Sequence, residues 1–327
     1  MRTLILKVSP ERSEDKVLDI AAEILKRGGL VAFPTETVYG LGADALNPEA
    51  VRRIFEVKQR PADNPLIIHV SNFKQIEEVA WMNEVAKKII DEFFPGPVAV
   101  IMKKKDIVPN ITTAGLDKVA VRMPDNRMAL RLIEKSGVLA APSANIAGRP
   151  SPTNAKHVLE DLEGKIEAVI DSGETEKGLE STVIDTTVYP ARILRPGPVT
   201  FEMLENIVSV KKGEAESSRY VHYSTSAELI LITGSKERME NEAKRIVSEF
   251  KKSGKKVGIV SISIEVDADF RIEFSSLEMF VKKIYAALRE LDKKADVIIV
   301  EGVEEKEIGF SVMNRLKKAA DKFYRFD

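Results

Sequence analysis

The chain contains no cysteine among its 327 residues. This absence excludes disulfide bonds, thiol nucleophiles and thiolate metal sites, and it suits a cytoplasmic protein. The three histidines, His69, His157 and His222, lie far apart in the sequence and form no zinc-binding pattern. We therefore expect no tightly bound metal ion.

Neither sign of charge is in excess, because 50 Lys and Arg are balanced by 51 Asp and Glu. Proteins that coat nucleic acid normally carry a basic excess, so we expect contact with tRNA to be weak or absent. No apolar run reaches the length of a membrane span, and the first residues contain no signal-type segment. The composition therefore predicts a protein without membrane association.

Common catalytic motifs are missing as well. The sequence contains neither the Walker loop G-x-x-x-x-G-K-[ST] nor the G-x-S-x-G elbow of hydrolases. The turn GSKERM at 234–239 is not a G-x-G-x-x-G loop either. Any reaction is therefore expected to depend on positioning and charge stabilisation rather than on a covalent nucleophile.

Short apolar runs in residues 1–206 predict an α/β domain on a mixed sheet, because strands and helices do not alternate strictly. We expect strands at 30–33, 66–70, 98–102, 119–123, 137–141, 168–172, 181–185 and 191–195. Helices are expected at 13–28, 47–55, 84–94, 126–136 and 153–163.

Residues 207–227 are polar and predict a linker. Residues 228–327 alternate regularly between strands and helices, which predicts a small Rossmann-like domain with a parallel sheet. Its expected strands are 228–233, 256–262 and 295–301, and its expected helices are 236–252, 276–292 and 311–322.

Polar side chains gather where the predicted strands of the first domain end. They are Thr35, Thr37, Lys58, Arg60, Asn64, His69, Arg122, Ser143, Asn145, Ser151, Ser181 and Arg195. Taken singly, each has an ordinary interpretation, such as a solvated loop charge, a paired arginine, a turn residue or a core histidine. Taken together, they lie where open α/β sheets bind ligands, and their donors suit a polyphosphate.

Several motifs together resemble one family. They are PTETVYGLG, the K-x-R of KQRPADNPL, VAVRMP, APSAN-x-x-GRPSPT, GLESTVID and RPGP. They are similar to the threonylcarbamoyl-AMP synthase family, which is built on a YrdC-like domain, over roughly residues 10–205. GFSVMNRLKKAAD resembles the end of the extra domain of two-domain members. The resemblance implies a YrdC-like twisted mixed sheet with helices and a Rossmann-like C-terminal domain.

The resemblance also implies a reaction. The family condenses L-threonine, bicarbonate and ATP to L-threonylcarbamoyladenylate and releases pyrophosphate, with Mg²⁺ accompanying the ATP. A separate tRNA threonylcarbamoyl transferase complex is the implied downstream partner, which modifies the adenosine next to the anticodon.

Roles are carried over by motif. The resemblance places ATP against Lys58, Arg60, Asn64, Lys118, Ser143, Asn145, Ser151, Arg195, His222 and Tyr223. It places L-threonine against Thr35, Thr37, His69, Arg122 and Ser181. Lys58 and Arg60 are the expected catalytic residues, because two anions react only where fixed cations offset their repulsion. Lys118 is expected to contact ATP through its backbone.

The linker departs from the family pattern. Two-domain relatives carry a segment like SPGMKYRHYAP that closes over the active site, whereas this chain has ESSRYVHYSTSAE at 216–228. Tyr220, His222 and Tyr223 are retained, so we expect the segment to act as a lid.

Two other interpretations remain open. A concave basic surface could hold double-stranded RNA or tRNA without catalysis, although the balanced charge disfavours this. YrdC-like domains also occur in carbamoyl-handling maturation enzymes, but those carry zinc-type cysteine clusters, which are absent here. The task of the C-terminal domain is open.

Overall fold

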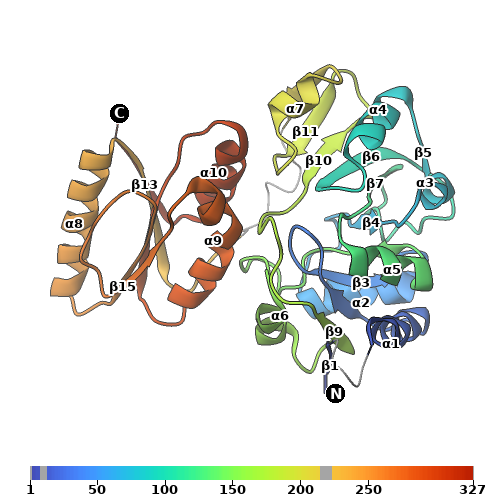
Figure 1. Ribbon diagram of the computed structural model, residues 1–327, viewed down its shortest axis with the longest axis horizontal. Helices are drawn as coiled ribbons and strands as arrows, with labels where there is room; N and C mark the ends of the chain where they lie inside the picture. Colours follow the sequence, from blue (N-terminus) through green and yellow to red (C-terminus); the bar gives the residue numbers. More distant parts are fainter. Residues whose placement is uncertain (1, 8–12, 214–222, 327) are drawn as a thin grey trace. The chain divides into compact units, whose positions relative to one another are not determined.

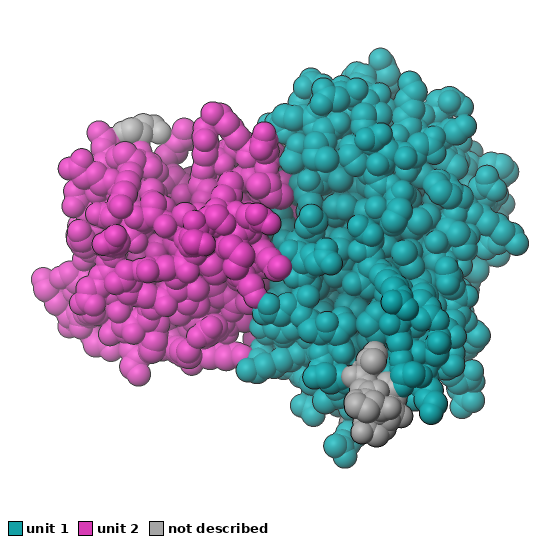
Figure 2. Space-filling model, viewed as in Figure 1, with its two compact units in different colours: residues 1–147, 151–218 teal, residues 148–150, 219–327 magenta. Residues whose placement is uncertain are grey.

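The computed structural model describes residues 2–7, 13–213 and 223–326. The chain forms two compact units, one of residues 1–147 and 151–218 and the other of residues 148–150 and 219–327 (Figures 1 and 2). The domain boundaries expected from the sequence, 1–206, 207–227 and 228–327, stay a prediction.

The first unit is built on a 12-stranded sheet with the order β1-β9-β2-β3-β8-β4-β7-β6-β10-β11-β12, and β5 pairs with β6. The strands are β1 (Leu4–Lys7), β2 (Val31–Phe33), β3 (Gly40–Asp44), β4 (Ile67–His69), β5 (Ala80–Trp81), β6 (Val98–Lys104), β7 (Lys118–Arg122), β8 (Leu139–Ala140), β9 (Ala168–Asp171), β10 (Thr182–Asp185), β11 (Ala191–Arg195) and β12 (Val210–Lys212). Strands β4 and β7 run parallel, whereas β6 and β7 run antiparallel. The mixed sheet predicted from the sequence is therefore confirmed.

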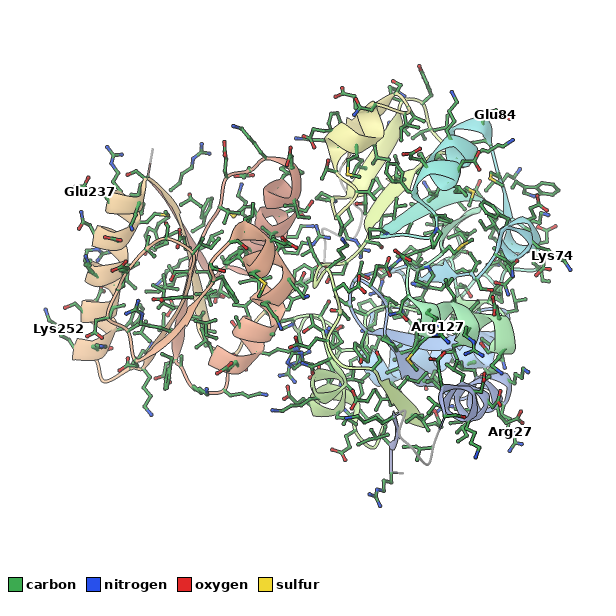
Figure 3. All side chains as sticks on the ribbon, viewed as in Figure 1. Arg27, Lys74, Glu84, Arg127, Glu237 and Lys252 are labelled. Atoms are coloured by element: carbon green, nitrogen blue, oxygen red, sulfur yellow. The ribbon has the colours of Figure 1, made fainter. Side chains whose placement is uncertain are left out.

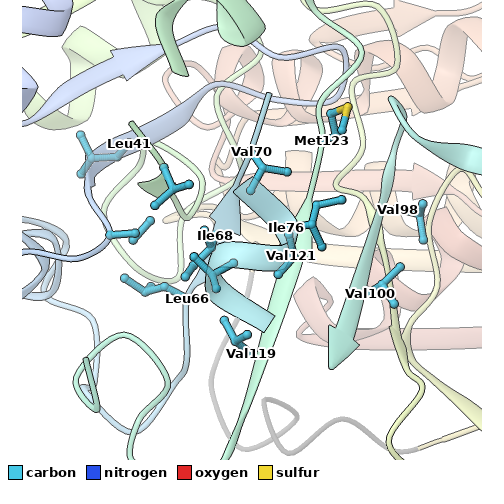
Figure 4. Close-up of a cluster of buried hydrophobic side chains, with 14 of the residues drawn as sticks. Leu41, Leu66, Ile68, Val70, Ile76, Val98, Val100, Val119, Val121 and Met123 are labelled. Atoms are coloured by element: carbon cyan, nitrogen blue, oxygen red, sulfur yellow. The ribbon is translucent and has the colours of Figure 1, made fainter. Parts of the chain in front are cut away.

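Two apolar clusters cover opposite faces of this sheet. Along β2, Val31 and Phe33 belong to one cluster and Ala32 to the other, because successive side chains of a strand point to opposite faces. Figure 4 shows part of the larger cluster, where Ile68 of β4 and Val121 of β7 are fully buried. Burial on both faces explains why these strands read as continuous apolar runs rather than as alternating ones.

The helices of the first unit are α1 (Glu14–Lys26), α2 (Pro48–Lys58), α3 (Phe73–Val79), α4 (Glu84–Phe93), α5 (Arg127–Ser136), α6 (Ala155–Leu162) and α7 (Phe201–Glu205). Asparagine side chains cap five of them by accepting backbone N–H bonds; these are Asn47, Asn72, Asn83, Asn126 and Asn154. Charged residues such as Lys74 and Glu84 occupy the solvent side (Figure 3).

Helix α2 is longer than the sequence predicted. It was expected to end at residue 55, but it continues to Lys58 and ends at Gln59, whose φ of 52° is left-handed. The expectation failed because Glu56, Val57 and Lys58 are all compatible with a helix, and the chain has no Gly to end it earlier. The extension carries Lys58 into the body of the unit rather than onto a loop.

The second unit holds a five-stranded sheet of order β15-β14-β16-β13-β17 in which every pair is parallel. Its strands are β13 (Glu228–Gly234), β14 (Val257–Ser261), β15 (Phe270–Glu273), β16 (Val297–Glu301) and β17 (Lys322–Phe326). Its helices are α8 (Lys236–Lys252), α9 (Leu277–Leu291) and α10 (Glu307–Ala319). The predicted Rossmann-like parallel sheet is confirmed.

Truncation of Ile68 tests the position of the core. Ile68 is 0% exposed, so Ile68→Ala should lower the free energy of unfolding by about 2–5 kcal/mol through lost burial and an unfilled cavity. Ile107 is 57% exposed, and Ile107→Ala should change the same quantity by less than about 0.5 kcal/mol. Chemical denaturation of both variants checks this, and equal losses would contradict the packing described.

Candidate active site

Three loops of the first unit are joined by backbone hydrogen bonds. The loop at 34–39 follows β2, and its Tyr39 amide donates to Pro152 O at 2.9 Å. The Ala144 amide donates to Tyr39 O at 2.8 Å, and the Gly178 amide donates to Thr37 O at 3.0 Å. Because these bonds connect segments far apart in the sequence, they bring the PTET, PSAN and GLEST motifs into one region.

Arg122 lies at the centre of a buried polar cluster. It ends β7 and pairs in register with His69 of β4. Its Nη2 donates to Thr37 Oγ1 at 2.8 Å and lies 2.7 Å from Glu36 Oε2. Thr37 in turn shares a 2.9 Å hydrogen bond with Thr35. All five side chains are buried, so the charge of Arg122 acts in surroundings of low dielectric constant.

The pKa of His69 is lowered from 6.5 to about 3, chiefly by burial and also by the nearby positive charges of Arg122 and Arg195. A hydrogen bond to Ile67 O at 3.3 Å opposes this shift without reversing it. The imidazole is therefore neutral at neutral pH. It can donate or accept a hydrogen bond, but it cannot hold an extra proton.

Arg195 joins the same region from β11. Its Nε donates to Ser181 O at 3.0 Å and its Nη2 donates to Ser181 Oγ at 3.1 Å. Gly197 permits this approach, because a Cβ there would lie 2.4 Å from the Thr182 amide and 2.7 Å from Glu180 O. Arg195, expected on the nucleotide side, thus lies beside a residue expected on the threonine side.

Lys58 is not the solvated charge that it would be in a simple turn. Lys58 is the last residue of α2, and only 1% of its surface is exposed. Its Nζ donates to Ser143 O at 2.5 Å and also to Asn145 O. The PSAN loop therefore meets Lys58 through its backbone carbonyl groups, and these neutral acceptors are ones that an anion can replace.

Arg60 and Asn64 lie at the turn after α2. Arg60 donates from Nε to Asn64 O at 3.3 Å and from Nη2 to Pro65 O at 3.2 Å. Asn64 is buried, whereas Arg60 is half-buried. The left-handed Gln59 turns the chain between Lys58 and Arg60, so the turn holds both cations at the same end of α2.

Ser151 and Glu180 form a buried pair from two of the three loops. Ser151 Oγ donates to Glu180 Oε1 at 2.5 Å. Asn145 Nδ2 donates to Ile146 O at 2.8 Å. Ser151 and Asn145 therefore already use these hydrogen bonds within the protein. A phosphate that binds here would have to replace Glu180 and the Ile146 carbonyl as their partners.

Lys118 lies apart from this cluster. Lys118 stands four residues before Arg122 on β7, a distance of roughly 13 Å along the strand. Its ammonium group forms an ion pair with Asp185 Oδ2 at 2.8 Å. Tyr223 belongs to the second unit, where its ring stacks on Tyr285 at 5.3 Å between centroids. His222 and most of the predicted lid lie outside the described residues.

Sequence reasoning missed two acidic side chains, Glu36 and Glu180, although both stand inside quoted motifs. They are 2% and 6% exposed and contact predicted site residues. The sequence signal that could have identified them is an ionisable residue within a short run of small and apolar residues. No three His, Asp or Glu side chains of the described residues gather to hold a metal ion.

Two family models match this chain. One, described as "Telomere recombination" and covering the Sua5, YciO and YrdC proteins, matches residues 23–197. The other, "Threonylcarbamoyl-AMP synthase, C-terminal domain", matches residues 199–321. The fold and the site thus define a YrdC-like α/β protein with an additional Sua5-type domain.

Individual relatives agree with these models. The chain is 47% identical to the threonylcarbamoyl-AMP synthase of Pyrococcus abyssi, over 97% of this chain and 98% of the relative. It is 40% identical to that of Bacillus subtilis, over 94% of each. The crystal structure of P. abyssi Sua5 complexed with L-threonine matches with a TM-score of 0.94 and 45% identity, covering 99% of this chain and all of the other. The chain belongs to the threonylcarbamoyl-AMP synthase family.

This membership confirms the resemblance drawn from the motifs, and it favours an enzyme of the nucleotidyltransferase type over the two other interpretations. None of the described helices is long and apolar enough to cross a membrane.

The low pKa of His69 leads to a prediction that NMR can check. The imidazole resonances of His69 should show no titration between pH 8 and about 4.5, because the pKa is about 3 in the folded protein. The chain has only three histidines, and His69→Asn identifies the signal. A midpoint near 6.5 would contradict the burial of a neutral ring.

The same shift predicts a pH dependence of stability. Between about pH 3 and 6.5 the unfolded chain binds a proton at residue 69 that the folded chain does not bind. The free energy of unfolding should therefore fall as the pH falls through this window. Denaturation at pH 7 and pH 5 should show a smaller fall for His69→Asn than for the unchanged protein.

Proposed function

We propose that this protein condenses L-threonine, bicarbonate and ATP to L-threonylcarbamoyladenylate and releases pyrophosphate. The observation that carries the proposal is the group of cationic side chains around three interlocked loops, Lys58, Arg122 and Arg195, of which the first two are almost completely buried. An anionic substrate complex is the ligand that such a site suits best.

L-Threonine is assigned to the cluster around Arg122. In this assignment the guanidinium group binds the carboxylate, and Thr35, Thr37, His69 and Ser181 line the pocket. Neutral His69 and the hydroxyl groups can hydrogen-bond the substrate without adding charge. The solved relative from P. abyssi is complexed with L-threonine, which supports L-threonine as a substrate of this chain.

ATP is assigned to the region around the end of α2. Lys58, Arg60 and Asn64 bind its phosphates together with Arg195, while Ser143, Asn145 and Ser151 line the same region. Lys118 contributes its backbone alone, because its ammonium group is paired with Asp185. Tyr223 and His222 complete the nucleotide side in this proposal.

The chemistry follows from bringing two anions together. The carbamate of threonine is a dianion, and its new carboxylate oxygen bonds to the α-phosphorus of ATP while the bond to pyrophosphate breaks. Lys58 and Arg60 stabilise the negative charge on the phosphoryl oxygens, and Arg122 offsets the repulsion at the threonine end. Mg²⁺ would arrive on the phosphates of ATP, since it needs few protein ligands when a nucleotide supplies the oxygens.

We further propose that the product passes to a tRNA threonylcarbamoyl transferase complex in the cytoplasm. An acyl-adenylate is readily hydrolysed, so a dedicated acceptor is chemically required. Direct binding of tRNA by this chain is not part of the proposal, because the net charge is −1.

Pyrophosphate release tests the proposed reaction. The assay contains ATP and Mg²⁺, with L-threonine and bicarbonate added separately and together. We expect release only when both are present. Release with neither would indicate ATP hydrolysis, and no release in any mixture would contradict the proposal.

Loss of the Lys58 charge should abolish adenylate formation. Lys58→Met keeps most of the buried stem but removes the ammonium group, so the rate should fall by about 100-fold or more, as for one charge-stabilising donor. Arg60→Ala should act in the same direction. Pyrophosphate release under saturating substrates measures both.

Lys74→Met is the matched control, since Lys74 is exposed on α3 (Figure 3). It should leave the rate unchanged. Circular dichroism and thermal denaturation should show that Lys58→Met remains folded. A folded Lys58→Met protein with nearly full activity would refute the assigned role.

A further inference from the structure

Glu36 is a buried carboxylate that the proposed chemistry does not use. It stands between Thr35 and Thr37 in the loop after β2, and 2% of its surface is exposed. Its Oε2 lies 2.7 Å from Arg122 Nη2. A buried charge is costly unless a partner compensates it, so each member of this pair depends on the other.

Arg122 is held through one end of its guanidinium group. Nη2 donates a hydrogen bond to Thr37 Oγ1 at 2.8 Å and forms an ion pair with Glu36 Oε2 at 2.7 Å. Neither carboxylate oxygen of Glu36 has a hydrogen-bond partner among the described residues, so the ion pair holds Arg122 by charge. Among the described residues, the buried Nε has no hydrogen-bond partner. A buried donor without a partner is unfavourable, and a ligand oxygen at this position would remove that cost.

We infer that Glu36 is a positioning residue that orients Arg122 for the carboxylate of the α-amino acid substrate. The inference rests on the proposed function and adds to it a residue that sets substrate specificity. Glu36 and Thr37 together fix the plane of the guanidinium group, because two contacts at one nitrogen leave it little freedom to rotate. Its remaining donors then face one direction, as recognition of a planar carboxylate requires.

The charge of Glu36 has a second effect. Arg122 and Arg195 are the two positive charges near neutral His69, and Glu36 compensates one of them. The threonine end then attracts a single carboxylate but is less attractive to phosphate groups. A binding site beside a triphosphate needs this discrimination, since ATP would otherwise compete for the same arginine.

The test compares the KM for L-threonine with the KM for ATP in the full-length protein. Glu36→Gln keeps the size and a polar oxygen of the side chain but removes its charge, whereas Glu36→Ala removes all three. We expect Glu36→Ala to raise the KM for L-threonine by about tenfold or more, because Arg122 loses the buried ion pair that orients it. Glu36→Gln should raise it less, and neither variant should change the KM for ATP by more than about twofold.

An analogue separates orientation of Arg122 from direct contact with the substrate. L-Threoninol lacks the carboxylate, so it cannot use Arg122. Its inhibition constant should therefore be the same in the unchanged protein and in Glu36→Gln. If instead the variant weakens L-threoninol as much as L-threonine, Glu36 contacts the ammonium group and the positioning role is wrong.

Glu77→Ala, at an exposed acidic residue of α3, is the control and should change neither KM. If Glu36→Ala fails to fold, Glu36→Gln and the analogue still decide the question. Equal KM values for L-threonine in Glu36→Gln and the unchanged protein would overturn the inference. Failure of the unchanged protein to need L-threonine would instead overturn the proposed function, so the two failures are distinguishable.

Discussion

The site depends on the burial of cationic side chains in the first unit. A buried ammonium or guanidinium group is strongly unfavourable unless polar groups surround it, so the fold must supply those groups. Backbone carbonyl groups of the PSAN loop do this for Lys58, and Glu36 and Thr37 do it for Arg122. The three interlocked loops therefore supply the groups that compensate the buried charges, and at Lys58 these groups are neutral carbonyls that an anion can replace.

The sheet makes this arrangement possible. Strands β4 and β7 pair in parallel, so that His69 and Arg122 reach the same end of the sheet. Fully buried apolar residues such as Ile68 and Val121 precede them and anchor both strands. The same low-dielectric surroundings strengthen the charge of Arg122 and keep His69 neutral. Burial thus places a positively charged guanidinium group beside an imidazole ring that is neutral at neutral pH.

Much of this fold could be predicted because the buried strands consist of consecutive apolar residues in the sequence. VAVIM at 98–102 and VGIVS at 257–261 are examples, and both form strands. Strand β3, GLGAD, was missed because its glycines carry no strand signal. Edge strands β15 and β17 were missed since FRIE and KFYRF are rich in charged residues, which suit an edge but weaken the apolar pattern.

The candidate site was predictable as a set of residues but not as a geometry. The motifs named most of the side chains that gather, yet the burial of Lys58 depends on where α2 ends. The pairing of Arg195 with Ser181 depends on the close approach that Gly197 allows. The partnership of Glu36 with Arg122 joins residues 86 positions apart, and only tertiary structure brings them together.

The central claim is that Lys58 exchanges carbonyl oxygens for phosphate oxygens when nucleotide binds. A crystal structure of the protein with a non-hydrolysable ATP analogue and L-threonine tests it most directly. The account predicts that Lys58 Nζ lies within about 3 Å of a phosphate oxygen, the distance of a charge-assisted hydrogen bond. A structure in which the triphosphate binds elsewhere, while Nζ keeps its bonds to Ser143 O and Asn145 O, would contradict it.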